Sequence, residues 1–282
     1  MLSVALLAMT FAPAAIPAPA PTTAGWHADY DSAARQAVAE KKDLVVYFQK
    51  KGELDGVFED EGVRGLLAKF ACLRVSADYQ LEGKRLLDHP VFSEMMGSPG
   101  LAVVCFRDPN APQYREAISV HPFVSSRYSW APSYGVEEVK TILNLPDGTL
   151  SQRSMIYAVS VHPERPRSIL AKCHRAFLGH AERHSRVQAS QARQHHANII
   201  AASYQLSSET GEGAGNASEV VAESWGNFVG GENVLEASFS CVDAWRHSPG
   251  HWGAVSRMHR FCGYDIARGA NGTWYATGIF AD

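Results

Sequence analysis

The sequence predicts an α/β protein built from two globular halves. Its 282 residues exceed one ordinary domain of about 150 residues. Apolar residues make up 46% of the chain and charged residues 20%, as is typical of globular proteins. In the first half, segments with helical spacing of apolar residues alternate with short β-branched runs, which favours a mostly parallel sheet covered on both faces.

The charge pattern argues against nucleic acid as a partner. The formal net charge is -3, and Lys and Arg are interspersed with Asp and Glu rather than gathered into basic blocks. The same pattern gives no reason to expect binding to an anionic membrane.

The first 24 residues predict an export signal. An apolar run from Leu2 to Phe11 precedes an Ala/Pro segment with small residues suited to cleavage, although no Lys or Arg precedes the run. The run is too short to span a bilayer, and no later segment is better suited. We therefore expect a secreted or periplasmic protein of the cell envelope, without a transmembrane segment in the mature chain.

The first domain is expected over residues 25–125. Asp31 or Ser32 can cap a helix that continues through Lys42, and LVVYF then reads as a buried strand. The segment FEDEGVRGLLAKF predicts a second helix and ACLRVSAD the next strand. A further short strand, SPGLAVVCF, is bounded by Pro and Gly.

This order of elements resembles the thioredoxin-like superfamily. In that family a reactive cysteine pair follows the strand corresponding to LVVYF, but QKKGELDGVF stands there in this chain, so dithiol exchange is not expected. The resemblance also implies a cis-proline, for which Pro99 is the candidate. It places the strands of Cys72 and Cys105 on either side of LVVYF, too far apart for a disulfide. We expect a redox-inactive scaffold in which both thiols are reduced.

The five cysteines follow no metal-binding pattern. They form no CxxC motif and have no zinc-ligand spacing; they stand at positions 72, 105, 173, 241 and 262. Export would permit a disulfide, and the odd number leaves at least one thiol outside any pairing.

A connector is expected over residues 126–150 and a second domain over residues 151–282. VEEVKTIL predicts a short helix in the connector. The main helix of the second domain is expected to begin near Arg167, with Ser168 as a candidate N-cap, and to continue through HHANII. SEVVAESW alternates like a strand, FSCVDAWRH predicts a helix ending at an SPG turn, and the tail predicts two strands joined by GANG.

The second domain resembles the CAP superfamily of cysteine-rich secretory, antigen 5 and pathogenesis-related proteins, most closely its bacterial members. The resemblance lies in the order of HAERHS, HH, SEVVAESW, WRHSPGHW and GYDIARGANGTWYATGIF. It implies an α-β-α sandwich in which two histidines and two acidic residues face a central cleft. Some members bind a divalent metal through the histidines and others bind lipids or sterols, so zinc and a small ligand are the expected occupants.

The resemblance also implies which residues form the site. His251 in SPGHW matches the second cavity histidine, and the first comes from His195 or His196, of which we prefer His196. The acidic residue corresponds to Glu219 in SEVVA, with Glu232 in GENV as the alternative. The fourth member of the group is not identifiable by spacing.

Each of these histidines has a structural alternative. Two imidazoles can hold Zn²⁺ while a carboxylate orients or deprotonates a bound water, but a histidine past a helix end can instead stabilise the last turn. In HAERH, His180 and His184 are four residues apart, yet Glu182 is displaced from the HExxH arrangement. We interpret that segment as a solvated or core-edge face. We expect His247 in solvent, and Trp245 and Trp274 in the core.

The leading interpretation is an exported two-domain binding protein rather than an enzyme. Its cleft would take a small or cell-envelope ligand, with a divalent metal such as zinc. The first alternative is a metal-assisted hydrolase acting on cell-wall or peptide substrate, with Glu219 as base and His251 as metal ligand. The second alternative is a structural interaction module.

Overall fold

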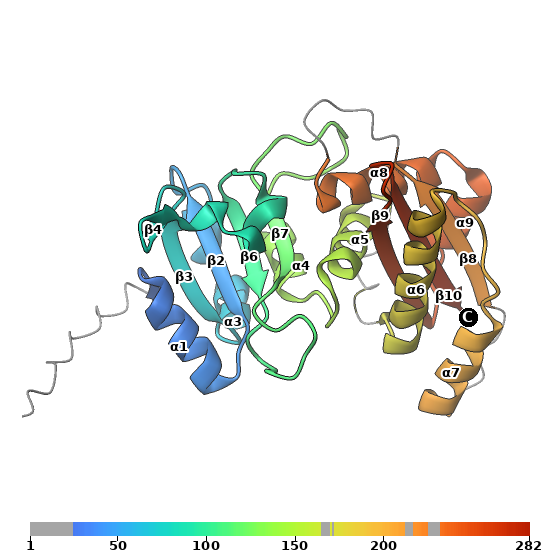
Figure 1. Ribbon diagram of the computed structural model, residues 1–282, viewed down its shortest axis with the longest axis horizontal. Coiled ribbons are helices and arrows are strands. Elements are labelled where there is room, and N and C mark those ends of the chain that lie inside the picture. Colours follow the sequence, from blue (N-terminus) through green and yellow to red (C-terminus); the bar gives the residue numbers. More distant parts are fainter. Residues whose placement is uncertain (1–24, 165–169, 171, 212–216, 225–231) are drawn as a thin grey trace, which may run out of the picture.

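The computed structural model describes residues 25–164, 170, 172–211, 217–224 and 232–282. These residues form a mixed α/β fold with two separate main sheets (Figure 1). We call residues 25–149 the N-lobe and residues 150–282 the C-lobe. The expected export signal, Arg167 and Ser168 lie outside the described residues.

The N-lobe is built on a five-stranded mixed sheet of order β1-β3-β2-β6-β7. Its strands are β1 (Trp26–His27), β2 (Leu44–Gln49), β3 (Ala71–Ser76), β6 (Gly100–Val104) and β7 (Ala117–Pro122). The first three run parallel to one another, whereas β6 and β7 are antiparallel to their neighbours. The expected mostly parallel sheet is therefore only half right, because β6 joins the sheet antiparallel to β2, and β7 antiparallel to β6.

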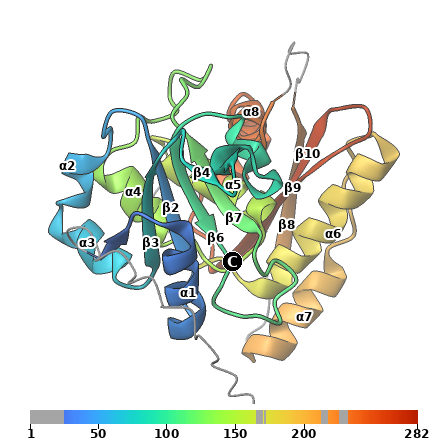
Figure 2. The ribbon, with the colours of Figure 1, turned by 60° about the vertical axis from the view of Figure 1, so that its left-hand side comes forward.

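Helices cover both faces of this sheet. They are α1 (Tyr30–Glu40), α2 (Asp55–Phe58), α3 (Glu61–Leu67) and α4 (Val136–Leu143), the last of which confirms the helix predicted in the connector. Figure 2 shows α1 on one side and α3 with α4 on the other. A hairpin of β4 (Gln80–Leu81) and β5 (Lys84–Arg85) and the 3₁₀ turns η1 (Leu86–Asp88) and η2 (Pro90–Met95) complete the lobe.

Two local expectations for the N-lobe have clear outcomes. The N-cap of α1 is Asp29, whose carboxylate accepts the amide of Ser32, so the cap lies before the predicted pair. Strand β2 does separate the strands of Cys72 and Cys105, as the predicted order of strands requires.

The expected cis bond before Pro99 is wrong. No described peptide bond is cis. The carbonyl of Pro99 accepts the amide of Phe123 at 2.7 Å, which continues the pairing of β6 with β7. An extended trans segment leads directly into the strand here, so nothing overrides the ordinary trans preference of proline.

The C-lobe is a three-layer arrangement around an antiparallel sheet of order β8-β10-β9. The strands are β8 (Ala217–Glu223), β9 (Phe261–Arg268) and β10 (Trp274–Ala281), and the helices are α5 (Leu150–Val161), α6 (Arg175–Gln191), α7 (Ile200–Thr210), α8 (Val234–Arg246) and α9 (Pro249–Ser256). Successive residues of β9 point to opposite faces of the sheet, and so toward different helices. A Cβ on Gly263 would lie 2.3 Å from the backbone of Phe177 in α6, whereas the next residue, Tyr264, packs on Trp245 of α8.

Two predicted elements of the C-lobe end or begin elsewhere. Helix α6 stops at Gln191, because Ala192 adopts a left-handed conformation (φ 49°) and its amide bonds the carbonyls of Gln188 and Ala189. The HH pair therefore lies in the loop before α7 and not on the helix. The SPG segment is not a free turn, since Ser248 is the N-cap of α9 and Pro249 its first residue, a position that proline favours.

The two lobes share one continuous hydrophobic core. Helix α5 lies between them: its Tyr157 packs at 4.5 Å from His121 of β7 and at 6.4 Å from Phe239 of α8, measured between ring centroids. Glu94 of the N-lobe accepts the first amide of α8, at Val234. Along the described stretches, no helix is both long and apolar enough to cross a membrane.

Candidate functional site

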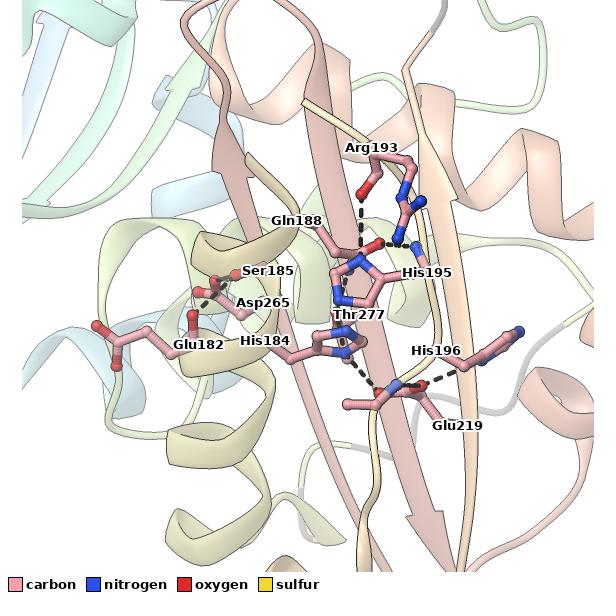
Figure 3. A network of polar contacts seen from close by, with 11 residues as sticks. Glu182, His184, Ser185, Gln188, Arg193, His195, His196, Glu219, Asp265 and Thr277 are labelled. Carbon is pink, nitrogen blue, oxygen red and sulfur yellow. Dashed lines mark hydrogen bonds and ion pairs between the residues drawn. The ribbon is translucent and has the colours of Figure 1, made fainter. Parts of the chain in front are cut away.

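Glu219 is the centre of a histidine-rich cluster in the C-lobe (Figure 3). It lies on β8, and its side chain is only 4% exposed. Its Oε1 is 2.6 Å from Nδ1 of His184, and its Oε2 is 3.1 Å from Nδ1 of His196 and accepts the amide of Ala197 at 2.9 Å. One carboxylate thus holds a residue of α6 and two of the loop that follows it.

The protonation of this cluster follows from its hydrogen bonds. Burial alone would raise the pKa of Glu219, but the hydrogen bonds from His184 and Ala197 outweigh burial and hold it below the ordinary value. The carboxylate is ionised at neutral pH and can only accept, so Nδ1 of His184 and of His196 donates. In its neutral form the His196 ring then offers the lone pair of Nε2 to a ligand.

The loop that carries the HH pair is tied back to the sheet by Gln188, the last fully buried side chain of α6. Its Oε1 accepts the amide of His195 at 3.2 Å, and its Nε2 donates to Oγ1 of Thr277 on β10 at 2.9 Å. The His195 ring packs edge-on against His184, with ring centroids 5.0 Å apart. The two neighbouring histidines therefore differ: His195 packs on α6 and His196 binds the carboxylate.

His196 and His251 face each other at the surface. Their ring centroids are 6.4 Å apart, and the side chain of His196 is 59% exposed. His251 lies in the first turn of α9, not past a helix end, so the stabilisation of a C-terminal turn does not apply to it. Burial, and then the neighbouring His196, lower the pKa of His251, which keeps its ring neutral at neutral pH.

Glu232, the alternative acidic residue in GENV, lies elsewhere. Its buried carboxylate pairs with Arg127, and burial raises its pKa. Arg127 belongs to the connector and also approaches Glu236 at 3.6 Å. Glu232 therefore joins the connector to the C-lobe and has no contact with the histidine cluster among those that the structure describes.

For HAERH the solvated alternative is wrong, and the core-edge alternative agrees with the structure. His180 and His184 are both buried, and neither ring nitrogen of His180 has a hydrogen-bond partner within the described part of the chain. His184 is the member of the cluster that sequence reasoning missed. The helical spacing could have predicted its burial, because His184 falls on the same face of the helix as Phe177, Ala181 and Gln188.

The remaining residues behave as expected. The side chain of His247 is 75% exposed, and Trp245 and Trp274 are buried. Within the described ranges, no three His, Cys, Asp or Glu side chains gather closely enough to form a complete metal site. His196 and His251 are thus a pair of nitrogen donors at a solvent-exposed edge.

Comparison with known proteins gives no relative: no family model, no curated protein and no solved structure matches this chain.

Proposed function

We propose that this chain is an exported two-domain binding protein whose C-lobe is a CAP-like domain that holds a small ligand at His196, Glu219 and His251. The observation that carries the proposal is the hydrogen bond from His196 to the buried Glu219. It fixes one imidazole so that its second nitrogen is available beside His251. A buried carboxylate that orients a histidine is the arrangement found behind metal-binding histidines.

The fold supports the two proposed domain types. The strand order β1-β3-β2-β6-β7, with the last two strands antiparallel, agrees with a thioredoxin-like domain. Helices on both faces of β8-β10-β9 agree with an α-β-α sandwich. Glu53 follows β2 where that family has its cysteines, and it accepts the hydroxyl of Tyr47, which supports a scaffold without dithiol chemistry.

A divalent cation such as Zn²⁺ suits the pair of imidazoles. The lowered pKa of His251 keeps that ring neutral, and Nδ1 of His196 is held by Glu219 so that its Nε2 faces outward. Zinc binds imidazole nitrogen at about 2.0–2.1 Å. Because the protein offers two nitrogen donors, oxygen atoms of water or of the ligand would complete the coordination. Zinc, when bound, would supply a Lewis-acidic position for an anionic or carbonyl group of a cell-envelope ligand.

Zinc titration calorimetry tests this proposal. The wild type is expected to release heat on binding, and His251→Ala and His196→Ala are expected to lose that heat. His247→Ala is the matched control, because His247 is a highly exposed histidine only four residues from His251. Equal heats from the wild type and His251→Ala would remove the metal from the proposal.

A hydrolase is the second candidate, and the Glu219–His196 pair favours it. In such an enzyme Nε2 of His196 and His251 would hold the metal, and Glu219 would orient the His196 ring through its Nδ1 hydrogen. The metal would supply the acidity of a bound water that attacks the substrate. Metal-dependent turnover of peptidoglycan or a peptide library that is lost in a folded Glu219→Gln variant would favour this function. If the zinc-loaded wild type shows no turnover, the hydrolase function is excluded and the proposed binding function stands.

A further inference from the structure

A pair of cysteines meets at the edge of the C-lobe sheet, away from the histidine cluster. Cys173 precedes α6 and forms a parallel bridge with Cys262 of β9, and the amide of the next residue, His174, donates to the carbonyl of Cys262 at 2.9 Å. The two sulfur atoms are 3.5 Å apart. We propose that Cys173 and Cys262 form a disulfide in an oxidising compartment, which links the start of α6 to the sheet.

The backbone already holds the two residues at the right separation. Neighbouring strands lie about 4.8 Å apart, inside the range of about 4.4–6.8 Å that disulfides need between Cα atoms. The sulfur atoms must approach by roughly 1.5 Å to reach the S–S length of about 2.05 Å, which rotation of the side chains can supply. No rearrangement of β9 or α6 is required.

Proximity of the sulfur atoms, together with the exposure of one of them, selects this pair from the five cysteines. Cys173 is partly exposed, so an oxidant can reach it, whereas the other four thiols are buried. Burial raises the pKa of Cys72 to about 12 and also raises the pKa of Cys105 and Cys241. Thiolates carry out disulfide exchange, so these three are poor reactants. Among the described contacts, the one between two sulfur atoms joins Cys173 and Cys262.

The oxidant is another disulfide, either of a small thiol such as glutathione or of a thiol oxidase. The thiolate of Cys173 attacks it, which breaks the external S–S bond, releases one thiol and leaves a mixed disulfide. The thiolate of Cys262 then attacks Sγ of Cys173 and displaces the second thiol. The pair loses two electrons to the external disulfide, and its two protons end on the released thiols.

Alkylation mapping tests the proposal on the purified chain. Samples equilibrated with oxidised or reduced glutathione are unfolded in N-ethylmaleimide and analysed by intact mass and peptide mass. The oxidised wild type is expected to be alkylated at Cys72, Cys105 and Cys241 alone, and to contain a peptide pair joined through Cys173 and Cys262. Closing this long loop is expected to raise Tm by about 5–10 °C over the reduced sample.

Two variants separate the steps. Cys262→Ser is expected to keep glutathione on Cys173, because no second thiol is left to displace it, and Cys105→Ser is expected to keep the joined peptides. Alkylation of both Cys173 and Cys262 in the oxidised wild type, or a lasting glutathione adduct on its Cys173, would overturn the proposal. Joined peptides with an unchanged Tm would refute the stabilising role.

Discussion

His184 of α6 and Glu219 of β8 form a buried pair, with 2.6 Å between Nδ1 and Oε1 and each side chain 4% exposed. The pair connects a helix to a strand of the sheet that it covers, in the second half of the helix. It uses one oxygen of the carboxylate and leaves the other for His196. His184 is therefore a positioning residue: it acts on the exposed histidine through Glu219.

Replacing His184 tests this positioning role. His184→Ala leaves one buried carboxylate oxygen without its donor, so we expect a loss of about 1–3 kcal/mol in the free energy of unfolding and a zinc affinity about 10–100-fold weaker. His184→Asn can keep a donor near the position of Nδ1 and should retain most of the affinity. Urea unfolding and calorimetry measure the two effects. His180→Ala is the control for loss of a buried histidine on the same helix, and a folded His184→Ala variant with unchanged affinity would contradict the role.

If Glu219 and not Glu232 belongs to the site, disturbing each glutamate should have a different effect on zinc binding. Arg127→Ala leaves the buried carboxylate of Glu232 without its cation, so stability should fall by about 1–3 kcal/mol while zinc binding stays unchanged. Glu219→Gln should instead weaken zinc binding, because an amide is a poorer acceptor for the Nδ1 hydrogens than a carboxylate. Calorimetry and urea unfolding on both variants measure the contrast. Loss of zinc binding in folded Arg127→Ala would place Glu232 in the site after all.

Asp265 predicts a specific dependence of stability on pH. Burial raises its pKa to about 7, although the hydroxyls of Ser151 and Ser185 donate to it. The unfolded carboxyl ionises near its ordinary value of 3.8, so between these two pH values the folded chain keeps a proton that the unfolded chain has lost. This group therefore makes the free energy of unfolding fall as pH rises, by at most about 1.4 kcal/mol per pH unit, and the full penalty is present above pH 7.

Asp265→Asn isolates that contribution from other titrating groups such as His121. The variant has no proton to lose at this position, so the stability of the wild type relative to the variant should decline steadily as pH rises from about 4 to about 7. Urea unfolding of both proteins at intervals across this range gives the difference directly. A difference that does not change with pH would mean that Asp265 ionises in the folded chain near its ordinary value.

Local patterns predicted β2, β3, β6 and the three strands of the C-lobe, because these are compact apolar or alternating runs between turn residues, and they predicted α4 and α8 from helical spacing. They missed β7 and the helix α5, which lies between the lobes. The end of α6 could not be predicted, since it depends on Ala192, an ordinary helix former, adopting a left-handed conformation. Sequence order likewise could not choose between Glu219 and Glu232. Long-range contacts decide that: the loop of His196 folds back to β8, and Arg127 of the connector occupies the other carboxylate.

The contact between Glu94 and α8 predicts that the two lobes unfold together. Oε2 of Glu94 in η2 accepts the amide of Val234 at 2.6 Å, and its carbonyl accepts the side chain of Asn233, the N-cap of α8. An acceptor at a helix N-terminus contributes about 0.5–2 kcal/mol, and here it comes from the other lobe. Since the core is also continuous across α5, loss of either lobe exposes apolar surface on its neighbour.

Differential scanning calorimetry of the wild type should therefore give one transition, whose calorimetric and van't Hoff enthalpies agree. Glu94→Ala should shift that single transition downward by about 1–4 °C, with both lobes melting at the lower temperature. Glu59→Ala removes an exposed carboxylate in the same lobe and should leave Tm unchanged. Two resolved transitions in the wild type, or a Glu94→Ala shift confined to one of two transitions, would mean that the lobes are energetically independent despite their shared core.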